Sequence, residues 1–174
     1  MKNISKVFAT AAVVLAFSNS SFAQASATAS AAATIITPIS ISKNVNMNFG
    51  NIAVSASVSG TVVLAPAGTR TTGGSGGVTL PSTTGTVAAA DFTVSGQASY
   101  TYAITLPSTT VTLSDGSGHT MGVTSFTSTP SSTGTLSGTG SQDLTVGATL
   151  SVASAQTPGT YTNSTGVPVT VNYN

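Results

Sequence analysis

The chain has 174 residues, of which only seven are charged: four are Lys or Arg and three are Asp, and there is no Cys and no Trp. A net charge of +1 without a basic stripe excludes nucleic-acid binding through phosphate neutralisation, and the lack of Cys excludes disulfides. Polarity comes from 32 Thr and 27 Ser, while 40% of the residues are apolar. This composition indicates a folded domain, because disordered chains combine low hydrophobicity with high net charge. The small number of charged residues also favours a location outside the cytoplasm, because cytoplasmic domains normally carry many more.

The N-terminal segment has the three parts of a secretory signal peptide. Residues 1–6 carry two lysines, residues 7–17 form an apolar run, and residues 21–23 end in a small-x-small pattern. This pattern predicts a signal peptide over residues 1–23 that is cleaved after Ala23. The apolar run is shorter than the about 20 residues that span a bilayer. We therefore expect export through the inner membrane, no integral membrane segment after cleavage, and a final location in a surface fibre or in the medium.

Residues 24–37 are predicted to form an N-terminal arm with a period of two. Such alternation is typical of a strand, and at about 3.3 Å per residue the arm reaches roughly 40 Å. Pro38 has no amide hydrogen and would end or redirect a ladder. A flexible leader is the alternative that the sequence leaves open. The apolar positions of the arm are Ala25, Ala27, Ala29, Ala31, Ala33 and Ile35.

Residues 38–174 alternate short β-branched runs with Gly, Ser, Pro and Asn, and no stretch shows the periodicity of a helix. The fold class expected from this pattern is all-β, with an immunoglobulin-like antiparallel β-sandwich that follows the extended arm. Turns are predicted at residues 73–77, 115–118 and 131–140. The predicted strands cover residues 45–49, 60–64, 77–80, 89–94, 99–106, 109–113, 120–126, 142–146, 149–153 and 167–173.

The last predicted strand also alternates, with Val167, Val169, Val171 and Tyr173 on one face. Pro168 lacks a donor, so pairing should begin after it or the strand should lie at an edge. Two such terminal strands suggest sheet edges that need a partner, and a strand from a neighbouring chain would supply one. The alternative is a closed sandwich in which the arm pairs within its own chain.

The sequence offers little for catalysis or metal binding. A Ser nucleophile needs a base, and His119 is the sole histidine. Asp115 and His119 lie in a predicted hairpin loop, and two ligands are fewer than the three or four of a metal site. We therefore predict that the protein is not an enzyme, with no catalytic residue, no metal site and no cofactor.

Arg70 and Asp91 stand out because the chain after residue 23 has so few charges. Each such charge must be either placed by partners or solvated. We expect Arg70 to pair with an Asp or with backbone carbonyls and thereby to close one end of the sandwich.

The two ends, the signal peptide and the all-β body resemble subunits of bacterial pili assembled by the chaperone-usher route. The matching parts are residues 25–35 and the closing strand 167–173 with its penultimate aromatic residue. The resemblance implies an incomplete immunoglobulin-like sandwich that the N-terminal arm of the next subunit completes. It also implies other copies of the chain as partners in a homopolymer, with a periplasmic chaperone and an outer-membrane usher.

The chain is also similar to a bacterial exported family known only as a domain of unknown function. The similarity spans about residues 25–174 and implies the fold better than it implies any chemistry. It is carried by residues 48–52, 60–62, 77–80, 90–96, 146–150, 159–161 and 169–173, together with Arg70 and Met121.

The sequence thus favours a structural subunit of a bacterial surface pilus that polymerises by donor-strand complementation. The alternative is a self-contained monomeric binding domain, secreted or at the cell surface and adhesin-like. Such a domain would bind through loop hydroxyls, amides and Tyr161, although few aromatic side chains are available to stack on sugars.

Overall fold

The computed structural model describes residues 24–174, and the predicted signal peptide at residues 1–23 lies outside them. These described residues divide into two parts, residues 24–35 and residues 36–174. Residues 24–35 carry no helix or strand and have exposed side chains, and Ile35 is 97% exposed. The strands within the described residues are β1 (Ser40–Val45), β2 (Asn48–Phe49), β3 (Ala53–Val54), β4 (Gly60–Leu64), β5 (Arg70–Gly73), β6 (Val78–Thr79), β7 (Val87–Ala88), β8 (Ala90–Ser95), β9 (Thr101–Thr105), β10 (Val111–Ser114), β11 (Thr120–Thr129), β12 (Thr133–Thr135), β13 (Ser141–Val152) and β14 (Thr170–Tyr173).

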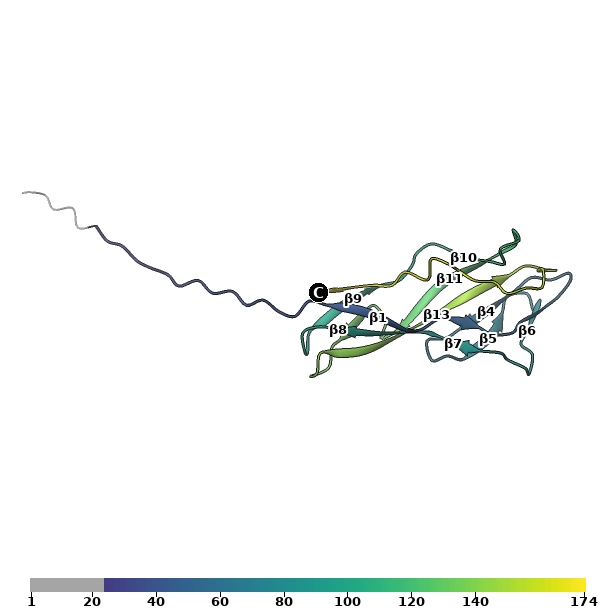
Figure 1. Cartoon of the computed structure of the whole chain (residues 1–174), viewed down its shortest axis with the longest axis horizontal. Coiled ribbons are helices and arrows are strands. Elements are labelled where there is room, and N and C mark those ends of the chain that lie inside the picture. The colour runs from purple at the N-terminus through teal and green to yellow at the C-terminus, as the bar shows by residue number, and fades with distance from the viewer. Residues whose placement is uncertain (1–23) are drawn as a thin grey trace, which may run out of the picture. The chain divides into compact units, whose positions relative to one another are not determined.

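We call residues 36–174 the body of the protein. A seven-stranded antiparallel sheet forms the larger layer of this body (Figure 1). Its order is β1-β8-β13-β11-β10, and β13 is the central strand. One edge of β13 pairs with β8 over residues 141–146 and with β4 over residues 148–152. The strand β5 in turn pairs with β4. The other edge of β13 pairs with β11. A 12-residue strand therefore organises the sheet, because two shorter strands share one of its edges.

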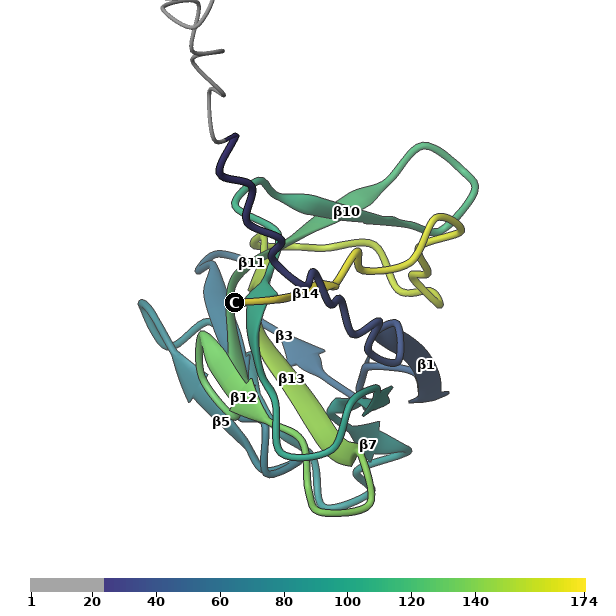
Figure 2. The ribbon, with the colours of Figure 1, turned by 90° about the vertical axis from the view of Figure 1, so that its left-hand side faces the viewer.

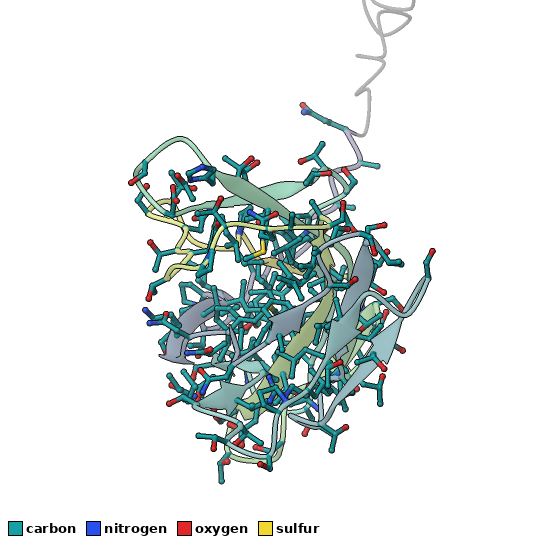
Figure 3. All side chains as sticks on the ribbon, turned by 90° about the vertical axis from the view of Figure 1, so that its right-hand side faces the viewer. Carbon is teal, nitrogen blue, oxygen red and sulfur yellow. The ribbon has the colours of Figure 1, made fainter. Side chains whose placement is uncertain are left out.

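A three-stranded sheet, β12-β9-β14, forms the second layer, and side chains fill the space between the layers (Figure 3). Tyr102, Leu136 and Val171 belong to the same buried cluster as the inward side chains of β8 and β13. A second cluster joins β4 to β11 and β13. The described fold is thus an all-β antiparallel sandwich, as predicted, because alternating side chains of both sheets meet in one interior. The short pairs β2-β7 and β3-β6 lie outside these two sheets.

Several predicted boundaries were wrong. The strands predicted at residues 142–146 and 149–153 are one strand, β13, because Gly147 continues the ladder instead of ending it. A Cβ at Gly147 would lie 2.2 Å from the carbonyl oxygen of Leu64, so glycine here permits a close backbone approach. The strand predicted at residues 45–49 is divided between β1, which begins at Ser40, and β2.

The predicted turn at residues 131–140 contains a strand, β12, which pairs with β9. Gly134 lies opposite Tyr102 in that ladder, and an added Cβ would be 2.3 Å from Cζ of the Tyr102 ring. The ring is fully buried, and its hydroxyl donates to Oε1 of Gln142 at 2.8 Å. Glycine is therefore required by the close packing of the aromatic ring against the backbone of β12.

We predict that Gly134→Ala lowers the free energy of unfolding by about 1–3 kcal/mol, because the ring has no space to retreat. Gly138→Ala is the matched control, since a Cβ there meets nothing within 4 Å. Urea denaturation of both variants measures the difference. Equal stabilities for the two variants would show that the packing at Gly134 is not restrictive.

Candidate assembly edge and arm root

The C-terminal strand β14 lies at the edge of the smaller sheet. Within residues 36–174 its one ladder partner is β9, with Val171 opposite Ile104 and Tyr173 opposite Tyr102. The side chains at residues 167, 169, 171 and 173 are less exposed than those at 168, 170, 172 and 174, as the sequence pattern predicts. Pro168 precedes the strand and takes no place in its ladder. The second edge of β14 therefore leaves its backbone groups free to accept another strand.

β1 is the corresponding edge of the larger sheet, with β8 as its one ladder partner in the described body. β1 and β14 approach each other, although no ladder joins them within residues 36–174. Ile39 and Ile41 on one side and Val169 on the other are partly buried side chains that pack against the same core cluster. We call this region the β1-β14 seam. Apolar side chains that are only partly covered, beside a strand with a free edge, are the surroundings that a further strand would complete.

Tyr173 connects the end of β14 to the residues that precede β1. Its hydroxyl donates to the carbonyl oxygen of Thr37 at 2.7 Å and accepts from the backbone amide of Gln97 at 2.6 Å. The amide of Thr37 in turn donates to Oε1 of Gln97 at 3.3 Å. Both backbone groups of Thr37 therefore have partners from the body of the protein. We call these three residues the arm root.

Arg70 begins β5, and its guanidinium binds backbone carbonyls. It donates to the carbonyl oxygens of Phe49 and of Asn51, the latter at 2.7 Å, and to that of Thr84 at 3.3 Å. Of the two kinds of partner expected for Arg70, carbonyls are the ones it contacts. The guanidinium thus holds together the chain after β2, the start of β5 and the loop before β7, because its fixed fork of donors serves several acceptors at once.

Comparison with known proteins adds one finding. The family described as "Domain of unknown function (DUF4402)" matches residues 39–173, which include the whole sandwich. The chain belongs to this family. We found no significant match among curated proteins or among solved structures. Membership of DUF4402 agrees with the second resemblance that the sequence shows, and it brings no named activity with it.

Asp91 does not contact Arg70 in this DUF4402 domain. Its carboxylate accepts from Nδ2 of Asn44 at 3.3 Å on the outer side of the β1-β8 pair. Within residues 24–174 the one close contact between a basic and an acidic side chain joins Nδ1 of His119 to Oδ2 of Asp115, at 2.6 Å in the hairpin loop between β10 and β11. The same residues contain no group of three or more potential metal ligands and no helix long and apolar enough to cross a membrane.

The carboxylate of Asp115 organises its loop. The amide of Ser117 donates to Oδ1 at 2.7 Å and is the largest cause that lowers the pKa of Asp115 below its ordinary value of 3.8, with the ring and amide of His119 adding to it. A carboxyl whose folded pKa is lowered stabilises the protein above its unfolded pKa, and this contribution is lost as the pH falls through the folded pKa.

We therefore predict that the Asp115 carboxyl titrates below pH 3.8 in the folded protein and that Asp115→Asn weakens the loss of stability in acid. NMR titration of the Asp115 carboxyl carbon measures the first, and thermal unfolding at several pH values measures the second. A pKa at or above the ordinary value would contradict this account of the loop.

A crevice of about 430 Å³ lies between β10 and the segment that leads into β14, which run side by side in Figures 1 and 2. Thr162 pairs with Ser114, and Nδ2 of Asn163 donates to the carbonyl oxygen of Thr112 at 2.8 Å. Tyr161 does not line the crevice, and its hydroxyl donates to the carbonyl oxygen of Thr157 and accepts from Nε2 of Gln156. The crevice therefore offers neutral hydroxyl and amide groups without an aromatic platform.

Sequence reasoning singled out Tyr173 as a penultimate aromatic residue but missed Thr37 and Gln97 as its partners. No spacing pattern marks them, because Gln97 lies in the loop between β8 and β9 and meets Thr37 only through the fold. The arm residues Ala25, Ala27, Ala29, Ala31, Ala33 and Ile35 are in no strand of the described chain, and their pairing with a partner stays a prediction.

Proposed function

We propose that this protein is a structural subunit of a bacterial surface fibre. Chains polymerise when the N-terminal arm of one subunit pairs with the free edge of β14 in the next, and this addition completes an immunoglobulin-like sandwich. The observation that carries the proposal is that β14 ends the smaller sheet with one free edge, beside the partly buried apolar residues of the β1-β14 seam.

The arm has the chemistry that this edge requires. Its alternate positions hold Ala or Ile, so one face is apolar and narrow while the other carries hydroxyls. At about 3.3 Å per residue, residues 25–35 are long enough to run beside all of residues 167–173. Strand addition of this kind takes its affinity from main-chain hydrogen bonds and its specificity from pockets for alternate side chains. Export by a signal peptide and the neutral, hydroxyl-rich surface suit a fibre outside the cell.

Electron microscopy of the purified chain from Gln24, together with gel electrophoresis in detergent before and after heating, tests the proposal. We expect filaments, and a ladder of oligomers that only heating dissociates. A monomer at all concentrations would contradict the proposal and would favour a self-contained surface domain that uses the crevice beside β10.

A further inference from the structure

The arm root fixes the residue at which the arm meets the sandwich. Thr37 is exposed, yet its carbonyl oxygen accepts from the Tyr173 hydroxyl at 2.7 Å and its amide donates to Gln97 Oε1 at 3.3 Å. Both partners belong to the smaller layer or to its loops, whereas the chain after Thr37 continues into β1 of the larger layer. Thr37 is therefore tied to β14 and to the β8-β9 loop just before the chain enters the other sheet.

The phenol of Tyr173 is itself held in place. The backbone amide of Gln97 donates to the Tyr173 hydroxyl at 2.6 Å, and the ring of Tyr100 packs edge-on against the Tyr173 ring at a centroid distance of 5.8 Å. Gly96 leaves the space that the phenol fills, since a Cβ there would lie 2.3 Å from the Tyr173 hydroxyl oxygen. A ring fixed on three sides keeps its hydroxyl directed at Thr37.

An arm that paired with β14 of its own chain would have to reverse direction before β1. The reversal would fall at residues 36–38, where the structure has neither a turn nor a bend. Pro38 suits the second position of a turn, and such a turn uses the carbonyl of the preceding residue, Thr37, as its acceptor. In the structure that carbonyl accepts from the Tyr173 hydroxyl, and no backbone amide of the described residues donates to it. Pro38 also disfavours a helical conformation at Thr37, and this disfavours a turn that has Thr37 at its second position.

We infer that Tyr173 and Gln97 act as a latch that holds Thr37 out of a turn and so keeps the arm from its own β14 edge. The latch leaves this edge to the arm of a second copy of the chain. Tyr173 and Gln97 are positioning residues in this role. The inference rests on the proposed function, because it explains why strand addition occurs between chains and not within one.

Hydrogen exchange on freshly refolded, dilute chains that begin at Gln24 tests the latch. The variants are Tyr173→Phe, Gln97→Ala and their combination, with Tyr100→Phe as the control because it leaves the Tyr173 hydroxyl unchanged. In the original chain and the control, we expect no protection of the amides of residues 25–35. In the latch variants we expect protection of the arm and a ratio of polymer to monomer that falls by about 2- to 10-fold for each hydrogen bond lost.

Two results would overturn the latch: an arm that is already protected in the original monomer, or latch variants whose arm exchange and polymer yield equal those of the control. If the original chain forms no polymer, the proposed function fails, while the exchange comparison between variants still decides whether the latch holds the arm. Gln97→Ala leaves β14 unaltered, so it remains informative if Tyr173→Phe impairs folding.

Discussion

Removal of the arm should abolish assembly. A chain that begins at Pro38 keeps the residues of both buried clusters, so it should fold into the sandwich while losing the strand donor. We expect it to stay unpolymerised by gel filtration and electron microscopy under conditions in which the chain from Gln24 forms filaments. Addition of a peptide of residues 25–35 should raise its thermal stability, because a ligand that binds only the folded state stabilises it by mass action.

The control for this experiment is a peptide of the same composition with its alternation destroyed, which should not stabilise the truncated chain. The opposite outcome is a truncated chain that unfolds beside a full-length chain that is a stable monomer. That result would assign the arm to its own sandwich.

Substitution of Arg70 should have the largest effect on stability of any charged side chain. Arg70→Ala removes donors to three carbonyls, and hydrogen bonds to a charged group are worth about 1.5–3 kcal/mol each. Because Arg70 is only half-buried and water can replace part of these contacts, we expect a loss of about 2–4 kcal/mol in the free energy of unfolding. Chemical denaturation measures it.

Lys43→Ala is the matched control for Arg70. The Lys43 ammonium lies on the surface and donates to Oδ1 of Asn46 at 2.8 Å, so its loss should cost under about 0.5 kcal/mol. Arg70→Lys should fall between the two, because it keeps the charge and loses the fork of donors. A loss below about 0.5 kcal/mol for Arg70→Ala would mean that the carbonyl contacts do not close this end of the sandwich.

The strands that sequence could predict are those with one strongly apolar face. The strand at residues 60–64 begins and ends where it was predicted, because Val62 and Leu64 are fully buried and alternate with less buried neighbours. β1 was placed too late in the chain because its side chains at residues 40–45 are mostly exposed and polar. Its strand conformation comes from pairing with β8, a contact between distant parts of the chain that local periodicity does not report.

The candidate site likewise has features that the sequence predicts and contacts that it does not. The alternation in residues 167–173 and the edge position of the last strand follow from a period of two and from Pro168, and the structure contains both. The partners of Arg70 and the contacts of Tyr173 with Thr37 and Gln97 depend on loops that the fold brings together. Backbone groups occur at every residue and a single glutamine forms no motif, so these contacts could not be predicted from the sequence.

Cross-linking between chains tests most directly whether the arm of one subunit pairs with β14 of another. The protein has no cysteine, so Val169→Cys in one chain and Ala29→Cys, Ala31→Cys or Ala33→Cys in a second chain introduce the sole thiols. A disulfide requires Cα atoms within about 4.4–6.8 Å, which neighbouring strands provide. We predict a dimer-sized product for at least one arm position when the two variant chains assemble together and are oxidised. No product between separate chains, with a monomer-sized cross-link when both substitutions are in one chain, would contradict assembly by strand exchange.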